Sequence, residues 1–112
     1  MVVGTLRIPL SRGIRVEVIQ IPQSLQGPVA AQPGCAGYHI YEETEPEPAV
    51  VLVERWESEA ELEEHIRSDG YLRILSAMEL SGRPPEVCFD FVSVSKGMEL
   101  IERLRGGRTE RQ

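Results

Sequence analysis

The chain has 112 residues, and its 18 acidic and 12 basic side chains give a formal net charge of −6. That length corresponds to one domain, and 41% hydrophobic with 27% charged residues is typical of a soluble globular domain rather than a disordered chain. A nucleic-acid binder needs a cationic face, and this acidic composition argues against one.

Targeting and redox features are sparse. No apolar run approaches the roughly 18 residues that a membrane helix needs, and no signal-peptide pattern is visible. Two cysteines do not make a disulfide framework. We therefore expect a cytoplasmic protein without a membrane partner, in which Cys35 and Cys88 are reduced. The eleven acids and two bases of residues 36–70 form either a solvated face or a surface for a cationic partner.

The N-terminal part predicts one strand and one ambiguous segment. Val2–Ile8 is rich in β-branched residues and ends at a proline, so we expect a strand there. Within residues 12–31, Arg15–Val18 alternates as a strand does. Apolar residues of the same segment also recur at helical spacing, at Ile14, Val18, Ile21 and Leu25. Pro22 opposes a smooth helix, because proline inside one costs about 3 kcal/mol, and local patterns leave the segment open.

Two further strands follow a turn at Gln32–Gly34. Alternation predicts the first over Gly37–Glu42, with Tyr38 on one face and His39 and Tyr41 on the other.

The next strand is predicted over Ala49–Trp56, after an acidic, proline-broken connector at residues 44–48. One face of this strand carries Val50, Leu52, Glu54 and Trp56. The other carries Val51, Val53 and Arg55. Because both faces are largely apolar, we expect the strand to be covered on both sides.

The remaining segments are mainly helical. Ser58 and Glu61 form a capping box, in which the serine accepts a backbone amide and the glutamate reaches back. The helix that it opens places three residues on one face, Leu62, His65 and Ile66. Ser68–Asp69 offers the cap of a second helix, which ends by Gly82. Its apolar face is predicted at Tyr71, Leu75 and Met78, with Leu72 alongside.

After this helix we expect a last strand over Val87–Val94, a short closing helix over Met98–Leu104, and a polar tail over residues 106–112. If residues 12–31 are helical, the order is β-α-β-β-α-β, the ferredoxin-like split β-α-β arrangement of an α+β protein. Its helices cover one face of the sheet. An open sheet face needs a partner, which points to a homodimer closing through that face.

Several motifs resemble the antibiotic biosynthesis monooxygenase family. They are Pro33-Gly34-Cys35-Ala36-Gly37-Tyr38, Leu52-Val53-Glu54-Arg55-Trp56-Glu57-Ser58, Leu62-Glu63-Glu64-His65-Ile66-Arg67-Ser68 and Pro84-Pro85-Glu86-Val87. The resemblance implies a dimeric α/β barrel of ferredoxin-like protomers, and hence a helix within residues 12–31. We expect a family domain over residues 1–95 and a C-terminal helix and tail over residues 96–112.

The resemblance also implies a range of activities. Some similar proteins oxidise quinols or polyketide anthrones with dioxygen and no cofactor, some degrade haem, some isomerise small phosphorylated sugars, and many have no known activity. The haem-degrading members use an asparagine, a tryptophan and a histidine. The comparable positions here are Gly4 or Thr5, His65 and about Leu75, which do not match.

Oxygenation without a cofactor needs a base that removes a phenolic proton, a dry pocket and aromatic walls. Histidine changes its charge closest to neutral pH, so His65 is the candidate catalytic base, although it can equally be a packed, hydrogen-bonded histidine. Trp56 and Tyr71 are candidate walls or simply core. Glu54 can orient His65, bind substrate or pair with an arginine across a dimer, and His39 can also line a cavity.

We therefore predict a monooxygenase for a quinol-like or polycyclic phenolic small molecule, acting as a homodimer and without metal, flavin or other cofactor. Two alternatives stay open, a non-catalytic dimeric protein that binds a small aromatic ligand, and an isomerase on the same scaffold. His39, Glu54 and His65 also have the composition of a non-haem iron triad, but their spacing matches no known motif.

Overall fold

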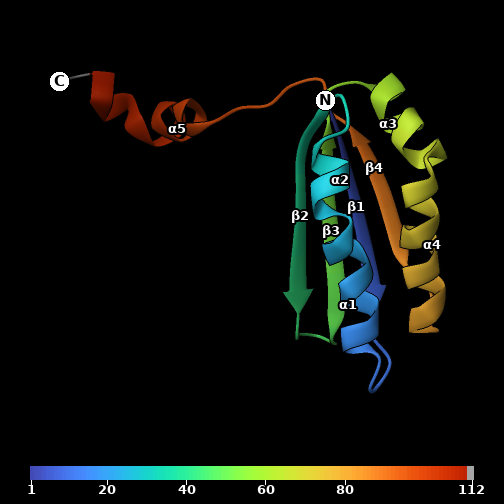
Figure 1. Ribbon diagram of the computed structural model, residues 1–112. Coiled ribbons are helices and arrows are strands. Elements are labelled where there is room, and N and C mark those ends of the chain that lie inside the picture. Colours follow the sequence, from blue (N-terminus) through green and yellow to red (C-terminus); the bar gives the residue numbers. More distant parts are fainter. Residues whose placement is uncertain (111–112) are drawn as a thin grey trace.

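The computed structural model describes residues 1–110, which form four strands and five helices (Figure 1). In chain order these are β1 (Val2–Pro9), α1 (Arg15–Ser24), α2 (Gln26–Ala30), β2 (Cys35–Glu43), β3 (Ala49–Trp56), α3 (Glu59–Arg67), α4 (Asp69–Ser81), β4 (Glu86–Phe91) and α5 (Met98–Glu110). None of the described helices is long and apolar enough to cross a membrane.

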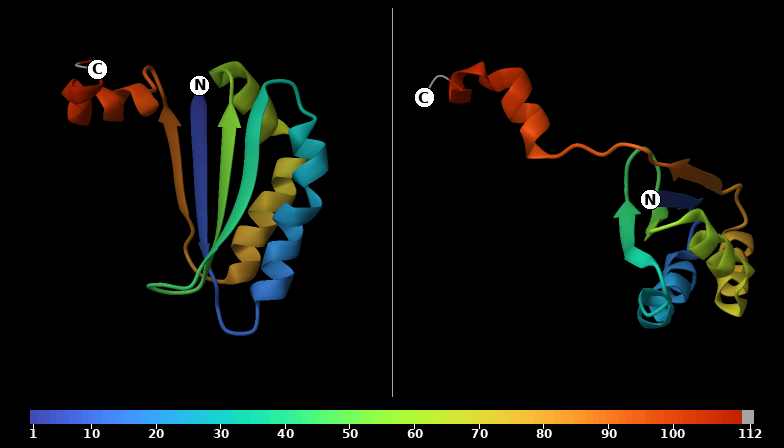
Figure 2. Two further views of the ribbon diagram at one scale, coloured as in Figure 1. Left: turned by 90° about the vertical axis from the view of Figure 1, so that its left-hand side faces the viewer. Right: turned by 90° about the horizontal axis from the view of Figure 1, so that it is seen from above.

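The four strands make one antiparallel sheet in the order β2-β3-β1-β4. Helices α1 to α4 all lie on one face of it, as Figure 2 shows, which is the predicted ferredoxin-like α+β fold. The opposite face is open, so this chain alone forms an open sheet and not a closed barrel. Both cysteines are free, with Cys35 on one edge strand and Cys88 on the other.

Strand β3 has the predicted bounds and the predicted two faces. Val50, Leu52 and Trp56 are buried beneath the helices. On the open face Arg55 is exposed and Val53 is half-buried. The expectation that the strand is covered on both sides is therefore met by the helices on one side only.

Within residues 12–31 the chain forms the helices α1 and α2, as the family resemblance implies. Val18, Leu25 and Val29 are buried against the sheet, and this burial outweighs the strand-like alternation of Arg15–Val18. Pro22 lies in the last turn of α1, and its carbonyl accepts a hydrogen bond from the Tyr38 hydroxyl at 2.8 Å. The chain then passes through Leu25 into the short α2.

The start of α3 follows the predicted capping box with one difference. Ser58 Oγ accepts the Glu61 amide at 3.3 Å, but the Glu61 carboxylate accepts from the Ser58 hydroxyl at 3.0 Å, not from a backbone amide. Ser68 is the N-cap residue of α4, as predicted, but it makes no side-chain cap bond, because its hydroxyl donates backwards to the His65 carbonyl at 2.6 Å.

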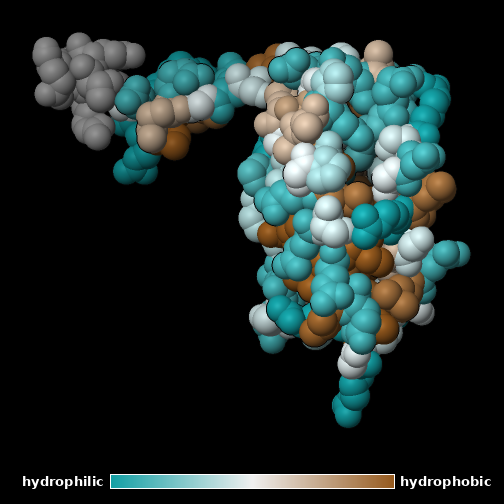
Figure 3. Space-filling view, viewed as in Figure 1, coloured by the Kyte–Doolittle hydropathy of each residue, from teal (hydrophilic) through white to brown (hydrophobic). Residues whose placement is uncertain are grey.

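The buried face of α4 is rotated from the predicted one. Tyr71 is buried as expected, but Ile74 and Ala77 accompany it. Leu75 and Leu72 are exposed instead, because the side of α4 that contacts the sheet is the one that carries Ile74 and Ala77. Hydrophobic residues consequently remain visible on the α4 side of the molecule in Figure 3.

The C-terminal region departs most from expectation. β4 ends at Phe91 rather than Val94, and α5 runs from Met98 to Glu110. Residues 106–110 are thus helical and not a polar tail, while residues 111–112 of that predicted tail lie outside the described residues. Figure 1 shows α5 standing away from the rest of the molecule.

Candidate functional site

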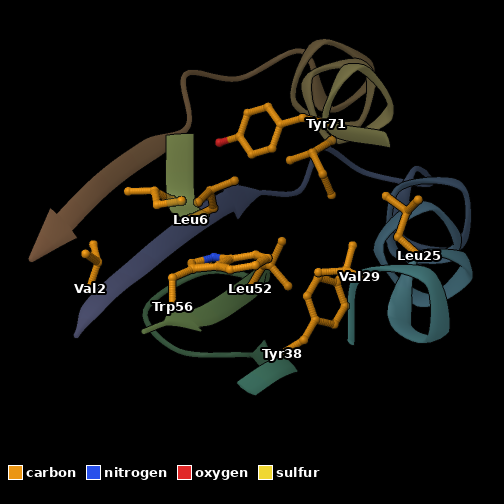
Figure 4. Close-up of a cluster of buried hydrophobic side chains, with 10 residues drawn as sticks. Val2, Leu6, Leu25, Val29, Tyr38, Leu52, Trp56 and Tyr71 are labelled. Carbon is orange, nitrogen blue, oxygen red and sulfur yellow. The ribbon is translucent and has the colours of Figure 1, made fainter. Parts of the chain in front are cut away.

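The largest buried cluster lies between the sheet and the helices, around Trp56 (Figure 4). The indole is fully buried, with Tyr71 of α4 and Tyr38 of β2 on different sides of it. Strand alternation directs Trp56 and Glu54 to this face of β3, and the register places Glu54 between Tyr38 and Gly4 of the neighbouring strands. A carboxylate therefore enters an otherwise apolar core.

That carboxylate is paired with His65 of α3. Glu54 Oε2 lies 2.9 Å from His65 Nε2, and both side chains are at most 1% exposed. The imidazole stacks on Trp56 with ring centroids 4.6 Å apart, and Tyr71 meets it edge-on at 5.2 Å. Four of the five predicted site residues, Glu54, Trp56, His65 and Tyr71, are thus in one cluster.

The second nitrogen of His65 faces Gln32, whose Oε1 lies 3.0 Å from Nδ1. An ionised carboxylate only accepts hydrogen bonds, so Nε2 carries the hydrogen of the bond to Glu54. Nδ1 is then the nitrogen that meets the Gln32 amide. With its amide oxygen towards the ring, Gln32 accepts from a protonated Nδ1. If the amide is turned so that its nitrogen faces the ring, Gln32 donates a hydrogen bond to an unprotonated Nδ1.

A cavity of about 290 Å³ reaches this histidine from outside. Its lining consists of Gln32, Pro33, Glu61, Glu64 and His65. Glu54, Trp56 and Tyr71 lie behind the histidine and are buried. The cavity therefore meets the buried cluster through His65, at the ring edge that carries Nδ1.

Local backbone geometry shapes the entrance. The predicted turn at Gln32–Gly34 places Gly34 at φ +81°, a conformation that favours glycine. A side chain at Gly34 would collide with the carboxylate of Glu61, which the capping box holds there. Gly34 also accepts the Glu57 amide at 2.9 Å, which ties the turn to the end of β3.

Two buried polar atoms in the cluster have no hydrogen-bond partner, Glu54 Oε1 and Trp56 Nε1. One is an acceptor and the other a donor, so the cluster keeps unused hydrogen-bonding capacity. Burial, and secondly the charge of Glu54, raises the pKa of Tyr71 to about 12. The same two causes raise the pKa of Tyr38. Both tyrosines are therefore neutral neighbours of a buried negative charge.

His39 lies elsewhere, since its neighbour Tyr38 faces the core and alternation turns His39 to the open face. It contributes to a larger cavity, about 490 Å³, at the edge of β2. The iron-triad alternative is accordingly not assembled. In the described part of the chain no group of three or more His, Cys, Asp or Glu residues could hold a metal ion. The larger cavity contains no buried titratable group, so we place the candidate site at His65.

The sequence patterns did not single out three residues of this site, Gln32, Glu61 and Glu64, as site residues. Gln32 was assigned only to a turn, and Glu61 only to a helix cap. Glu61 and Glu64 precede His65 by four and one residues on α3, so helical spacing is a local signal for Glu61. Gln32 has no such signal, because its position beside His65 depends on how α2 and α3 meet.

Comparisons with known proteins agree with this fold. The profile of the family described as antibiotic biosynthesis monooxygenase matches residues 1–77. No curated protein matches the chain. Among solved structures, Rv0793 of Mycobacterium tuberculosis has a TM-score of 0.76 at 27% identity, covering 86% of this chain and 98% of that one.

Two more distant structures share the fold. A protein from Deinococcus radiodurans, named after the antibiotic biosynthesis monooxygenases, has a TM-score of 0.77 at 13% identity, covering 87% of this chain and 97% of its own. A conserved protein from Methanosarcina mazei Go1 has a TM-score of 0.71 at 23% identity, with coverages of 80% and 89%. With the profile match spanning more than half of its residues, the chain belongs to the antibiotic biosynthesis monooxygenase family.

Proposed function

We propose that the protein is a monooxygenase that oxidises a quinol-like or polycyclic phenolic substrate with dioxygen, using His65 as the base and no bound cofactor. The observation that carries the proposal is the buried Glu54–His65 pair, which meets a cavity through the histidine alone. Membership of a family named for monooxygenases supports the reaction class.

The chemistry begins with a proton transfer. His65 Nδ1 takes a phenolic proton once the substrate hydroxyl replaces Gln32 at that nitrogen. The resulting electron-rich anion passes electrons to dioxygen, and one oxygen atom bonds to a ring carbon. The other leaves as water, so a hydroquinone and dioxygen give a hydroxyquinone and water.

Glu54 stabilises the imidazolium formed in this step. It accepts the Nε2 hydrogen, orients the ring and supplies a compensating negative charge in a site shielded from water. Trp56 holds the imidazole by stacking, and Tyr71 fixes its edge. Neither side chain lines the cavity, so their proposed role as aromatic walls for a flat substrate requires the cavity to open past His65.

The proposal includes a homodimer through the open sheet face, since proteins of this family are typically dimeric. That face carries Val3 and Val53, which are half-buried, and Val51, which is already buried by its own chain, while α1 to α4 lie on the other face. Two such faces brought together would close the expected α/β barrel. The cytoplasmic location stays a prediction.

Oxygen uptake by chelator-treated protein over a panel of hydroquinones and anthrones tests the proposal. We expect uptake above the uncatalysed rate and a loss of about 100-fold or more in His65→Ala, because general-base catalysis contributes that much. His65→Gln keeps a hydrogen-bonding side chain without a base and should lose as much.

Three results would contradict this. An undiminished rate in His65→Ala, or a greater loss in His39→Ala, would remove His65 from the reaction. Saturable ligand binding with a flat oxygen trace would instead identify a binding protein. A product with the mass of its substrate would identify an isomerase.

A further inference from the structure

Helix α5 is the one described element that stands off the body of the fold. The radius of gyration is 17.4 Å, against about 13 Å for a compact domain of this length. Figure 2 shows that α5 projects on the open-face side of the sheet, away from α1 to α4. The chain reaches it through residues 92–97, which form neither helix nor strand.

The exposed surface of α5 is partly apolar. Met98, Ile101 and Leu104 recur every third residue, and they are 64%, 53% and 70% exposed. They form a stripe along one side of a helix of 13 residues. An isolated helix of that length is only marginally stable in water, so this stripe needs a surface to pack against.

A matching apolar surface lies at the opposite edge of the molecule, between α4 and β4. We call it the α4–β4 patch, and its exposed members are Leu72, Leu75, Val87 and Phe91. Val87 and Phe91 pair with Leu6 and Val2, so they lie on the helix side of the sheet.

The patch is uncovered because α4 turns its other flank to α1. Arg73 on that flank bonds Ser24 at 2.7 Å, and Leu72 and Leu75 lie on the flank facing away from α1. In Figure 3 hydrophobic residues show along this α4 side.

Three observations select a second copy of the chain as the occupant. First, α5 points from the open face, where a second copy would lie, and away from the patch of its own chain. Second, the exposed area is 7257 Å², about 1,100 Å² more than a compact monomer of this mass shows and as large as one side of a stable interface.

Third, the charges are complementary. Residues 96–112 hold five basic and three acidic side chains, a net charge of +2. Residues 1–95 hold seven basic and fifteen acidic ones, a net charge of −8. The link and α5 together reach about 40 Å, which exceeds the roughly 10 Å that separates packed layers, so the arm can pass the edge of a facing sheet.

We propose that α5 is an exchanged arm, whose stripe of Met98, Ile101 and Leu104 packs on the α4–β4 patch of a second copy. This division at about residue 95 corresponds to the proposed boundary between the family domain and the C-terminal segment. The inference extends the proposed homodimer, because each copy then holds the other by its arm as well as by its sheet.

Sedimentation of the full-length protein tests the arm. Ile101→Ser combined with Leu104→Ser removes apolar area without adding charge, and should raise the dimer dissociation constant about tenfold or more. Leu72→Ser combined with Leu75→Ser should do the same from the other surface. Val16→Ser, an exposed valine on α1, is the matched control and should leave the constant unchanged.

Cysteine cross-linking identifies which chain receives the arm. In a Cys35→Ser, Cys88→Ser background, chains carrying Leu104→Cys are mixed with chains carrying Leu72→Cys and oxidised. A disulfide between the two kinds of chain is expected. A cross-link only within a doubly substituted chain, or none, would overturn the exchange. A dimer that survives both serine pairs unchanged would overturn the arm alone, whereas a monomeric wild type would overturn the sheet-face dimer as well.

Discussion

Two regions of the sheet, around the central strand β3 and around the edge strand β4, differ in how completely the chain buries its own side chains. Around β3, a carboxylate, a histidine and a tryptophan are fully enclosed by residues of the same chain. Around β4 and α5, large apolar side chains such as Phe91 and Leu104 are more than half exposed. The first region is buried within a single molecule, although two of its polar atoms lack a hydrogen-bond partner, whereas the second leaves apolar side chains open to another molecule.

Replacing the central tryptophan is the most severe test of this difference. Trp56→Ala should lower the free energy of unfolding by about 3–5 kcal/mol, because a large buried ring leaves a cavity. Leu104→Ala should change it by no more than about 0.5 kcal/mol at protein concentrations well below the dissociation constant of the proposed dimer, because Leu104 is exposed on the single chain. Urea unfolding of both variants measures the contrast. Equal losses would show that α5 packs on its own chain.

Removing the buried charge comes next in size. Glu54→Leu leaves His65 without its partner and should cost about 3 kcal/mol, as breaking a buried pair does. Glu54→Gln keeps a hydrogen-bonding group and should cost less. Glu99→Leu in α5 is the comparison, since that exposed carboxylate accepts the backbone amide of Gly97, and its effect should be small. Urea unfolding measures all three variants. An unchanged free energy of unfolding in Glu54→Leu would mean that the pair contributes nothing to the stability of the fold.

The smallest expected effect appears in alkali. Burial raises the pKa of Tyr71 from 10.0 to about 12, so the folded chain keeps a proton that the unfolded chain releases. Stability should therefore fall as the pH rises from about 10 to 12, by about 2 kcal/mol from this residue. Tyr71→Phe should flatten that fall, whereas Tyr41→Phe on the open face should not. If the free energy of unfolding fell equally with pH in wild type and Tyr71→Phe, the Tyr71 hydroxyl would be exposed to water and not buried.

The predictions from sequence succeeded where local pattern and packing agree. Ala49–Trp56 alternates cleanly, and because alternation also fixes which side chains share a face, Glu54 and Trp56 were paired before the fold was known. The capping box predicts the start of the helix, and helical spacing from that start predicts that His65 shares a face with Leu62. For residues 12–31 the local patterns conflict, and the family resemblance was needed to favour the helix.

The failures have a common physical cause, which is dependence on contacts between distant segments. Leu75 and Ile74 are equally apolar, and only the angle at which α4 meets the sheet decides which is buried. Gln32 reaches His65 because α2 ends beside α3, which no local pattern encodes. The polar tail predicted over residues 106–112 is wrong for its first part, because α5 continues through Gly106 and Gly107 to Glu110.

The position of β2 at the sheet edge has a consequence for solubility. A nine-residue edge strand offers unpaired backbone groups on which other chains can polymerise. This strand ends in Glu42 and Glu43, and Arg15 clasps Glu42 with two bonds of 2.6 and 2.8 Å. A strand of another chain that paired with β2 would have to break this ion pair and come close to two carboxylates. The ionic end of β2 thus acts as a gatekeeper against aggregation, and leaves face-to-face association as the safer way for two copies to meet.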